Sequence, residues 1–111
     1  MPNPRNKKVE HPSPRHGKLL NTLGNPKRWL ILKKLQQGEH SVGDLAGWME
    51  KSSSTISNCL RSLKTDGLVV SKTSGHKVIY SLHPNVKPYF AEFADALDAL
   101  LKATKMARYN E

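Results

Sequence analysis

The stretch SSSTISNCLRSLKTDGLVV, residues 52–70, decides the fold of this chain. Its apolar residues Ile56, Leu60 and Leu63 recur at helical spacing and define one apolar face. Gly67 is a typical helix end, and a run rich in β-branched residues follows it. The stretch therefore predicts a helix with an apolar back and a polar front that leads directly into a strand.

The polar front of this helix has the composition of a surface that reads DNA. Hydroxyl, amide and basic side chains hydrogen-bond to phosphates and base edges, and a helix of this kind fits the major groove. We expect the basic side chains to pair with phosphates and the hydroxyl and amide groups to face bases. The residues that we expect to contact DNA, on the helix and on the segment after it, are Ser52, Ser53, Ser54, Thr55, Ser57, Asn58, Arg61, Lys64, Lys72, His76 and Lys77.

The bulk composition agrees with an anionic partner. The chain has 111 residues and a formal net charge of +9, from 18 Lys and Arg against 9 Asp and Glu. Such a balance most often indicates nucleic acid and less often a membrane surface. No apolar run approaches the roughly 18 residues of a membrane-spanning helix, and the N-terminus lacks the apolar core of a secretory signal. The single cysteine, Cys59, fits a reducing compartment, so we expect a cytoplasmic protein without a membrane partner.

The flanking segments predict a mainly α-helical chain with a small β-hairpin. Ser41, with Asp44 three residues later, is expected to cap the helix that precedes the polar-faced one. Two helices joined by a short turn and followed by a two-stranded ribbon constitute a winged helix-turn-helix. The expected helices cover residues 19–23, 26–37, 41–50 and 52–66 and a long segment from residue 84, and the expected strands cover 68–72 and 77–82.

Two regions are expected along the chain. Residues 1–16 are rich in proline and basic residues and predict a flexible basic arm, with a solvated tail of no special role as the alternative. Residues 17–107 form the domain that binds DNA and dimerises. The last helix is apolar on one face and is expected to pack against a second copy of the chain, while folding back onto its own domain is the alternative. The expected dimer residues are Leu19, Leu20, Leu23, Phe90, Phe93, Leu97, Leu100 and Leu101.

The run from Leu23 to Leu82 resembles the ArsR/SmtB family of dimeric winged helix-turn-helix transcriptional repressors. The resemblance is carried by Asn25-Pro26 with Arg28, by Ser41-Val42-Gly43-Asp44-Leu45-Ala46, by Ser54-Thr55-Ile56-Ser57 and by Val78-Ile79-Tyr80-Ser81-Leu82. It covers about residues 17–105. The resemblance implies a homodimer that represses transcription by occupying an inverted-repeat operator in double-stranded DNA. Glu50 and Lys51 depart from the family's usual turn of glycine and an apolar residue between the two helices.

The resemblance also bears on the signal that such a repressor would sense. Metal-sensing members carry a Cys-Val-Cys-Asp-Leu run at the start of the third helix, and Ser41 and Gly43 stand at those two cysteine positions here. Other members bind zinc through Asp and His pairs on the last helix, which here offers Asp95 and Asp98 but no histidine. We therefore expect no metal site and no cofactor. A small-molecule or redox inducer stays open, the latter through oxidation of Cys59, although a half-buried packing role explains that thiol more simply.

Two other functions are compatible with the sequence. A winged helix can serve as a protein-interaction module, and a basic chain can coat DNA without sequence preference. Preference for one DNA sequence distinguishes a repressor from both. An enzyme is not expected, because no Ser-His-acid spacing and no phosphate-cradling glycine loop is present.

Overall fold

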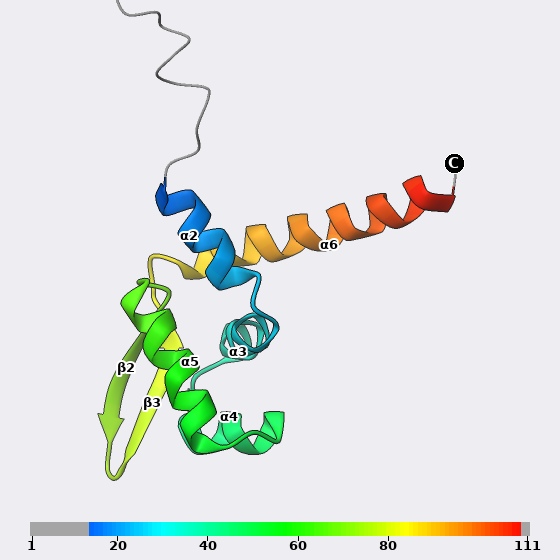
Figure 1. Cartoon of the computed structure of the whole chain (residues 1–111). Coiled ribbons are helices and arrows are strands. Elements are labelled where there is room, and N and C mark those ends of the chain that lie inside the picture. Colours follow the sequence, from blue (N-terminus) through cyan, green and yellow to red (C-terminus); the bar gives the residue numbers. More distant parts are fainter. Residues whose placement is uncertain (1–13, 110–111) are drawn as a thin grey trace, which may run out of the picture.

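The computed structural model describes residues 14–109 as a helical domain with one small sheet (Figure 1). The sheet is antiparallel with strand order β1-β3-β2. The predicted winged helix-turn-helix is confirmed, with one addition: a third, two-residue strand lies beside the hairpin. The elements in chain order are α2 (Pro14–Leu23), α3 (Pro26–Gln37), β1 (His40–Ser41), α4 (Val42–Met49), α5 (Ser53–Thr65), β2 (Val69–Ser74), β3 (Lys77–Leu82) and α6 (Lys87–Tyr109).

Side-chain caps fix where the central helices begin. Asn25 accepts a hydrogen bond from the backbone N–H of Arg28 at the start of α3. Ser41 and Asp44 form the predicted capping box at α4, each side chain accepting from the other's backbone N–H. The hydrogen bond from the Ser41 backbone N–H is the main cause that lowers the pKa of the Asp44 carboxyl below its usual value. Ser52 caps α5 by accepting from the backbone N–H of Thr55 at 3.1 Å.

The core lies where α3, α4 and α5 meet the sheet. The apolar face predicted for the polar-fronted helix is confirmed, because its three members have no exposed area. The side chains that are fully buried across these helices are Ile31, Leu32, Leu45, Ile56, Leu60 and Leu63. Helix α6 joins this core through its first turns, where the Phe90 ring lies 5.3 Å from that of Trp29, centroid to centroid. The remainder of α6 extends away from the domain (Figure 1).

Several element ends differ from those expected. Helix α2 begins at Pro14, three residues before the expected domain boundary, so the expected arm overlaps a helix; residues 1–13 of that arm lie outside the described residues. Helix α6 begins at Lys87, because the residues after Pro84 form a turn first. The hairpin is longer than expected, since β2 extends to Ser74 and Gly75, with a φ of 63°, makes the turn.

The turn between α4 and α5 contains a left-handed residue that is not glycine. Glu50 has φ 55° and ψ 45°, a conformation that costs most side chains energy. Its backbone N–H donates to Gly47 at 3.3 Å, and that of Lys51 donates to Ala46 at 3.0 Å. The departure from the family's glycine therefore leaves the geometry of a normal helix end intact.

Helix α2 is attached to the end of α5 by a largely buried polar contact. The hydroxyl of Thr22, 3% exposed, donates to Asp66 Oδ2 at 2.6 Å, and Lys18 Nζ lies 3.6 Å from Asp66 Oδ1. The Asp66 side chain is only 11% exposed. Because an acceptor with so little access to water needs a donor, Thr22 is expected to be a stabilising residue.

Replacing Thr22 by valine tests this contact. Thr22→Val keeps the shape of the side chain but removes the donor, so we expect the free energy of unfolding to fall by about 1 to 3 kcal/mol. Chemical denaturation measures this free energy of unfolding. The matched control is Thr104→Val, whose exposed hydroxyl donates to the Leu101 carbonyl at 2.8 Å and whose loss should cost less than about 0.5 kcal/mol. Equal losses in the two variants would contradict the assigned role of Thr22.

Candidate nucleic-acid interface

The outward side of α5 presents one continuous line of polar side chains. Ser54, Asn58, Arg61 and Thr65 are separated by four, three and four residues, so they share one helix face. Ser54, Asn58 and Arg61 are exposed, as is Thr65. We call these four residues the α5 ridge. The ridge points away from the buried back of the helix, which is the geometry that a groove-reading helix requires.

Hydrogen bonds already order part of the ridge. Arg61 Nη1 donates to Asn58 Oδ1 at 3.0 Å, with both groups exposed. The remaining guanidinium N–H groups and the Asn58 amide N–H groups are oriented on the same surface as donors. Ser52 and Thr55, by contrast, bond to each other at the helix start, their hydroxyls 2.9 Å apart. Of these two predicted DNA contacts, Ser52 therefore also serves as the N-cap of α5, and Thr55 is its hydrogen-bond partner.

The other predicted residues of the helix flank the ridge. Ser53 is exposed in the first turn of α5, and Ser57 is half-buried. Lys64 Nζ donates to Ser71 Oγ at 2.8 Å, which connects α5 to strand β2. Lys64 therefore both orients the wing and adds positive charge beside the ridge.

The predicted wing residues lie on the exposed end of the β2-β3 hairpin. Lys72, His76 and Lys77 are all exposed. Lys72 Nζ lies 3.3 Å from a carboxylate oxygen of Glu39, a surface pair worth little in free energy. The wing thus carries positive charge at its tip, while one of its predicted cations also pairs within the protein.

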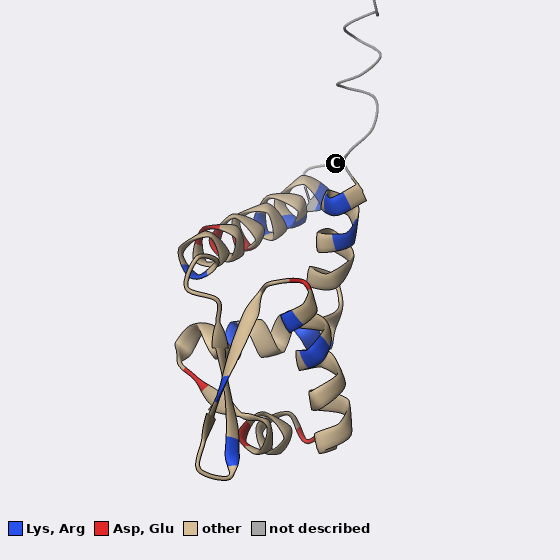
Figure 2. Ribbon diagram, turned by 90° about the vertical axis from the view of Figure 1, so that its left-hand side faces the viewer, with Lys and Arg blue, Asp and Glu red and all other residues tan. Residues whose placement is uncertain are grey.

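The structure adds basic residues to this surface that the sequence did not single out. A hollow of about 390 Å³ opens between α2, α3 and α5, and Lys18 and Arg28 line it together with Arg61, Ser62, Thr65 and Asp66. Figure 2 shows Lys and Arg segments of α2 above those at the C-terminal end of α5, on one side of the molecule. We call this feature the basic hollow. Ser62 and Thr65, four residues after Asn58 and Arg61, are the members that helical spacing alone could have added.

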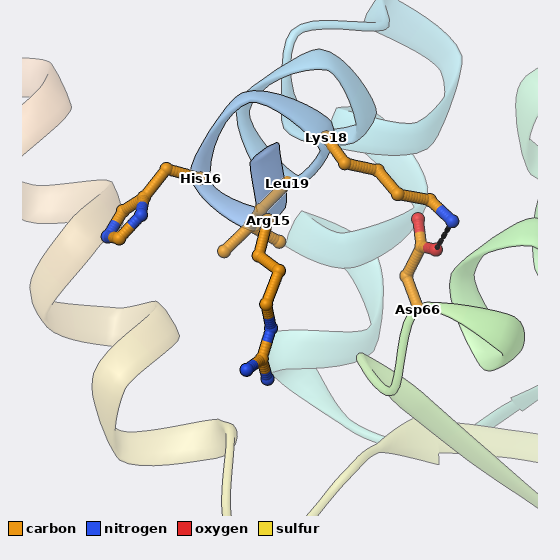
Figure 3. A pocket seen from close by; sticks show the side chains of 5 residues that line it. All are labelled: Arg15, His16, Lys18, Leu19 and Asp66. Atoms are coloured by element: carbon orange, nitrogen blue, oxygen red, sulfur yellow. Dashed lines mark ion pairs between the residues drawn. The ribbon is translucent and has the colours of Figure 1, made fainter. Parts of the chain in front are cut away.

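A second hollow, of about 560 Å³, lies beside the first and shares Lys18 and Asp66 with it. Figure 3 shows Lys18 reaching toward Asp66, while His16 points in the opposite direction, toward α6. Arg15 also lines this space. Arg15 and His16 both lie on the same side of the Lys18–Asp66 pair in this view.

Most of the expected dimer residues are left uncovered by the chain's own fold. Leu20, Leu100 and Leu101 are 60, 59 and 67% exposed. Leu19, Phe93 and Leu97 are also exposed, whereas Leu23 is half-buried against the core. Phe90, which was also expected at the dimer interface, packs within the core of its own chain. It is only 4% exposed because it packs on Trp29 within the core.

Redox and metal chemistry have few candidate residues in the described part of the chain. Cys59 is half-buried on α5. Within residues 14–109, no group of three His, Cys, Asp or Glu side chains is placed to hold a metal ion. None of the helices in this described part is long and apolar enough to cross a membrane.

Comparisons with known proteins agree on one family. The model for the arsR family of bacterial regulatory proteins matches residues 25–71. The transcriptional regulator NmtR of Mycobacterium tuberculosis is 39% identical over 64 residues, which are 58% of this chain and only 53% of NmtR. The arsenical resistance operon repressor of Staphylococcus xylosus is 30% identical over 80 residues, 72% of this chain and 77% of that repressor.

A solved structure extends the likeness to the three-dimensional fold. The homodimeric winged helix-turn-helix DNA-binding domain of Mb0332 from Mycobacterium bovis, described as a possible ArsR-family regulator, superimposes with a TM-score of 0.69. The two sequences are 29% identical, and the match covers 86% of this chain and 95% of that domain. Together with the α4-turn-α5 arrangement and the wing, these likenesses show that the chain belongs to the ArsR family of bacterial regulatory proteins.

Proposed function

We propose that this chain is a cytoplasmic, homodimeric transcriptional repressor that binds an inverted-repeat operator in double-stranded DNA. The observation that carries the proposal is the α5 ridge, an exposed polar line on a helix whose opposite face is completely buried. Such a helix can enter the major groove without rearrangement of the domain. Repression would follow because the bound dimer excludes polymerase from the promoter. The role is regulatory, and no catalytic step is assigned to it.

The uncovered apolar face of α2 and α6 supports the dimer. Leu97, Leu100 and Leu101 lie on one side of α6 and would lose their exposure against the same helix of a second chain. A two-fold dimer would present two α5 ridges and two wings. For an operator of two half-sites, the ridges would be spaced by one turn of DNA, roughly 34 Å.

The residues at the start of α4 support a repressor that does not use the family's cysteine metal site. Ser41 Oγ is committed to the capping box, where it accepts from the Asp44 backbone N–H at 3.0 Å. Gly43 has no side chain to offer. A hydroxyl is also a poor ligand for soft thiophilic metals. The inducing signal is therefore proposed to be a small molecule or a redox change rather than a metal bound at α4.

Non-specific coating of DNA is the second candidate function. The formal net charge of +9 favours it, because phosphate contacts bind every sequence alike. The protein-interaction module is the third. Only DNA sequence preference separates these candidates from a repressor, and it is therefore what the first experiment measures.

Fluorescence anisotropy with the promoter upstream of the protein's own gene is the direct experiment. We expect the promoter duplex to bind about a thousandfold more tightly than a scrambled duplex of the same length, as specific regulators do. Both are titrated at two salt concentrations. Equal and strongly salt-dependent binding to the two duplexes would favour a coat, and no binding to either would favour a protein partner.

Variants of the ridge test how DNA is read. Arg61→Ala should weaken binding to every duplex and reduce the slope of log affinity against log salt by about one unit. Asn58→Ala should instead reduce the preference between operator and scrambled DNA, since amides read base edges. Lys87→Ala, which removes an exposed cation at the start of α6, is the control. Unchanged binding in both ridge variants would exclude α5 as the reading helix.

A charge on the apolar face of α6 tests the dimer. Leu101→Glu should raise the dimer dissociation constant by at least about tenfold, because a carboxylate would enter an apolar interface. The monomer should stay folded, since Leu101 is 67% exposed. Sedimentation velocity measures the dimer dissociation constant, and circular dichroism measures whether the variant is folded. Lys102→Glu places the same charge off the leucine stripe and should leave the dimer unchanged; equal effects would locate the interface elsewhere.

A further inference from the structure

The basic hollow combines three cations with a carboxylate that already has partners. Lys18, Arg28 and Arg61 come from α2, α3 and α5, so three elements converge on one space. Asp66 is the one acidic residue among its lining residues, and it accepts from Thr22 at 2.6 Å. Asp66 also lies within 3.6 Å of Lys18. Because its carboxylate already has these two partners, it neutralises little of the charge of Arg28 and Arg61.

Arg28 carries the least satisfied donor on this surface. Its Nε is buried and has no hydrogen-bond acceptor among residues 14–109. A buried donor without an acceptor is unfavourable, by roughly 1 to 3 kcal/mol for such groups in general. A modest rotation of the guanidinium toward an acceptor in the hollow would remove this penalty. The hollow is therefore arranged to gain a ligand that is anionic and rich in acceptors.

The other lining groups suit a tetrahedral oxyanion. Two guanidinium forks can each donate two parallel hydrogen bonds to a phosphate, a geometry that lysine cannot reproduce. The hydroxyls of Ser62 and Thr65 add donors that rotate to fit. Thr65 is also the last member of the α5 ridge, so the hollow continues the surface proposed to face DNA.

We propose that the basic hollow is a phosphate-binding site, with Arg28 and Arg61 as the principal donors. Its natural occupant is a backbone phosphate of the operator, a part of the proposal that rests on the proposed function. Bound there, one phosphate would fix α3 and α5 against the same DNA strand. A free phosphate-bearing molecule offers the same chemistry, so the experiment includes separate arms for the two sources.

The experiment follows the Arg28 Nε–Hε resonance of the full-length protein by NMR. The protein is titrated with inorganic phosphate at constant ionic strength, with chloride as the balancing anion, and separately with the operator or scrambled duplex. We expect a saturable shift of this resonance in both titrations. Arg28→Lys keeps the charge but removes Nε and the planar fork. Monitored through the backbone amides of Ser62 and Thr65, it should weaken phosphate binding about tenfold.

Two further variants keep the outcome interpretable. Lys27→Gln removes the neighbouring exposed cation, which does not line the hollow, and should leave phosphate affinity unchanged. Thr65→Val alters an exposed position without risk to the core and should weaken phosphate binding severalfold. A shift with phosphate and with DNA supports the backbone phosphate as the occupant. A shift with phosphate alone, in a protein that binds DNA, supports the site with a free anion instead.

Two results would overturn the site. One is the absence of any saturable shift of Arg28 Nε–Hε with phosphate and with DNA, and the other is equal phosphate affinity in wild type and Arg28→Lys. Failure of the proposed function has a different signature. In that case the wild-type protein binds no DNA in the anisotropy titration, while the phosphate titration, which needs no DNA, still reports on the hollow.

Discussion

The burial of the apolar back of α5 is the constraint on which the surface chemistry of this protein depends. Ile56, Leu60 and Leu63 have no exposed area, and burying such side chains contributes about 1.5 to 3 kcal/mol each. An exposed hydrogen bond like that between Arg61 and Asn58 contributes only about 1 kcal/mol. The orientation of the helix is thus set by its hidden face, while its outward side chains remain free to exchange partners.

A second constraint links this helix to the part of the molecule that is proposed to meet a second chain. Asp66, directly after α5, accepts from Thr22 of α2, and α2 also carries the exposed leucines Leu19 and Leu20. If two copies packed along α2, a change in that packing would therefore reach the end of α5 through the largely buried Thr22–Asp66 hydrogen bond.

The sequence predicted those parts of the fold that local chemistry determines. The apolar face of α5 and the Ser41–Asp44 capping box were predicted correctly, because helical periodicity and cap spacing are local signals. The spacing of Phe90 and Phe93 fits one stripe of α6, and both rings lie near Trp29. Only tertiary packing distinguishes them, since Phe90 is 4% exposed and Phe93 is 37% exposed. A two-residue strand such as β1 leaves no periodic trace at all. The basic hollow was missed because Lys18, Arg28 and Arg61 converge only through tertiary packing.

In the proposed complex, the contact between Arg61 and Asn58 would couple phosphate binding to base recognition. In the free protein the guanidinium occupies Asn58 Oδ1, one of the two amide atoms needed for a bidentate contact with adenine. If Arg61 turned to a phosphate, that oxygen would lose its present donor and could accept from a base with both lone pairs. Phosphate binding would then prepare base reading, at the cost of one exposed hydrogen bond. Because an exposed hydrogen bond contributes little in water, the exchange would be close to balanced, and contacts with the bases would then decide whether it is completed.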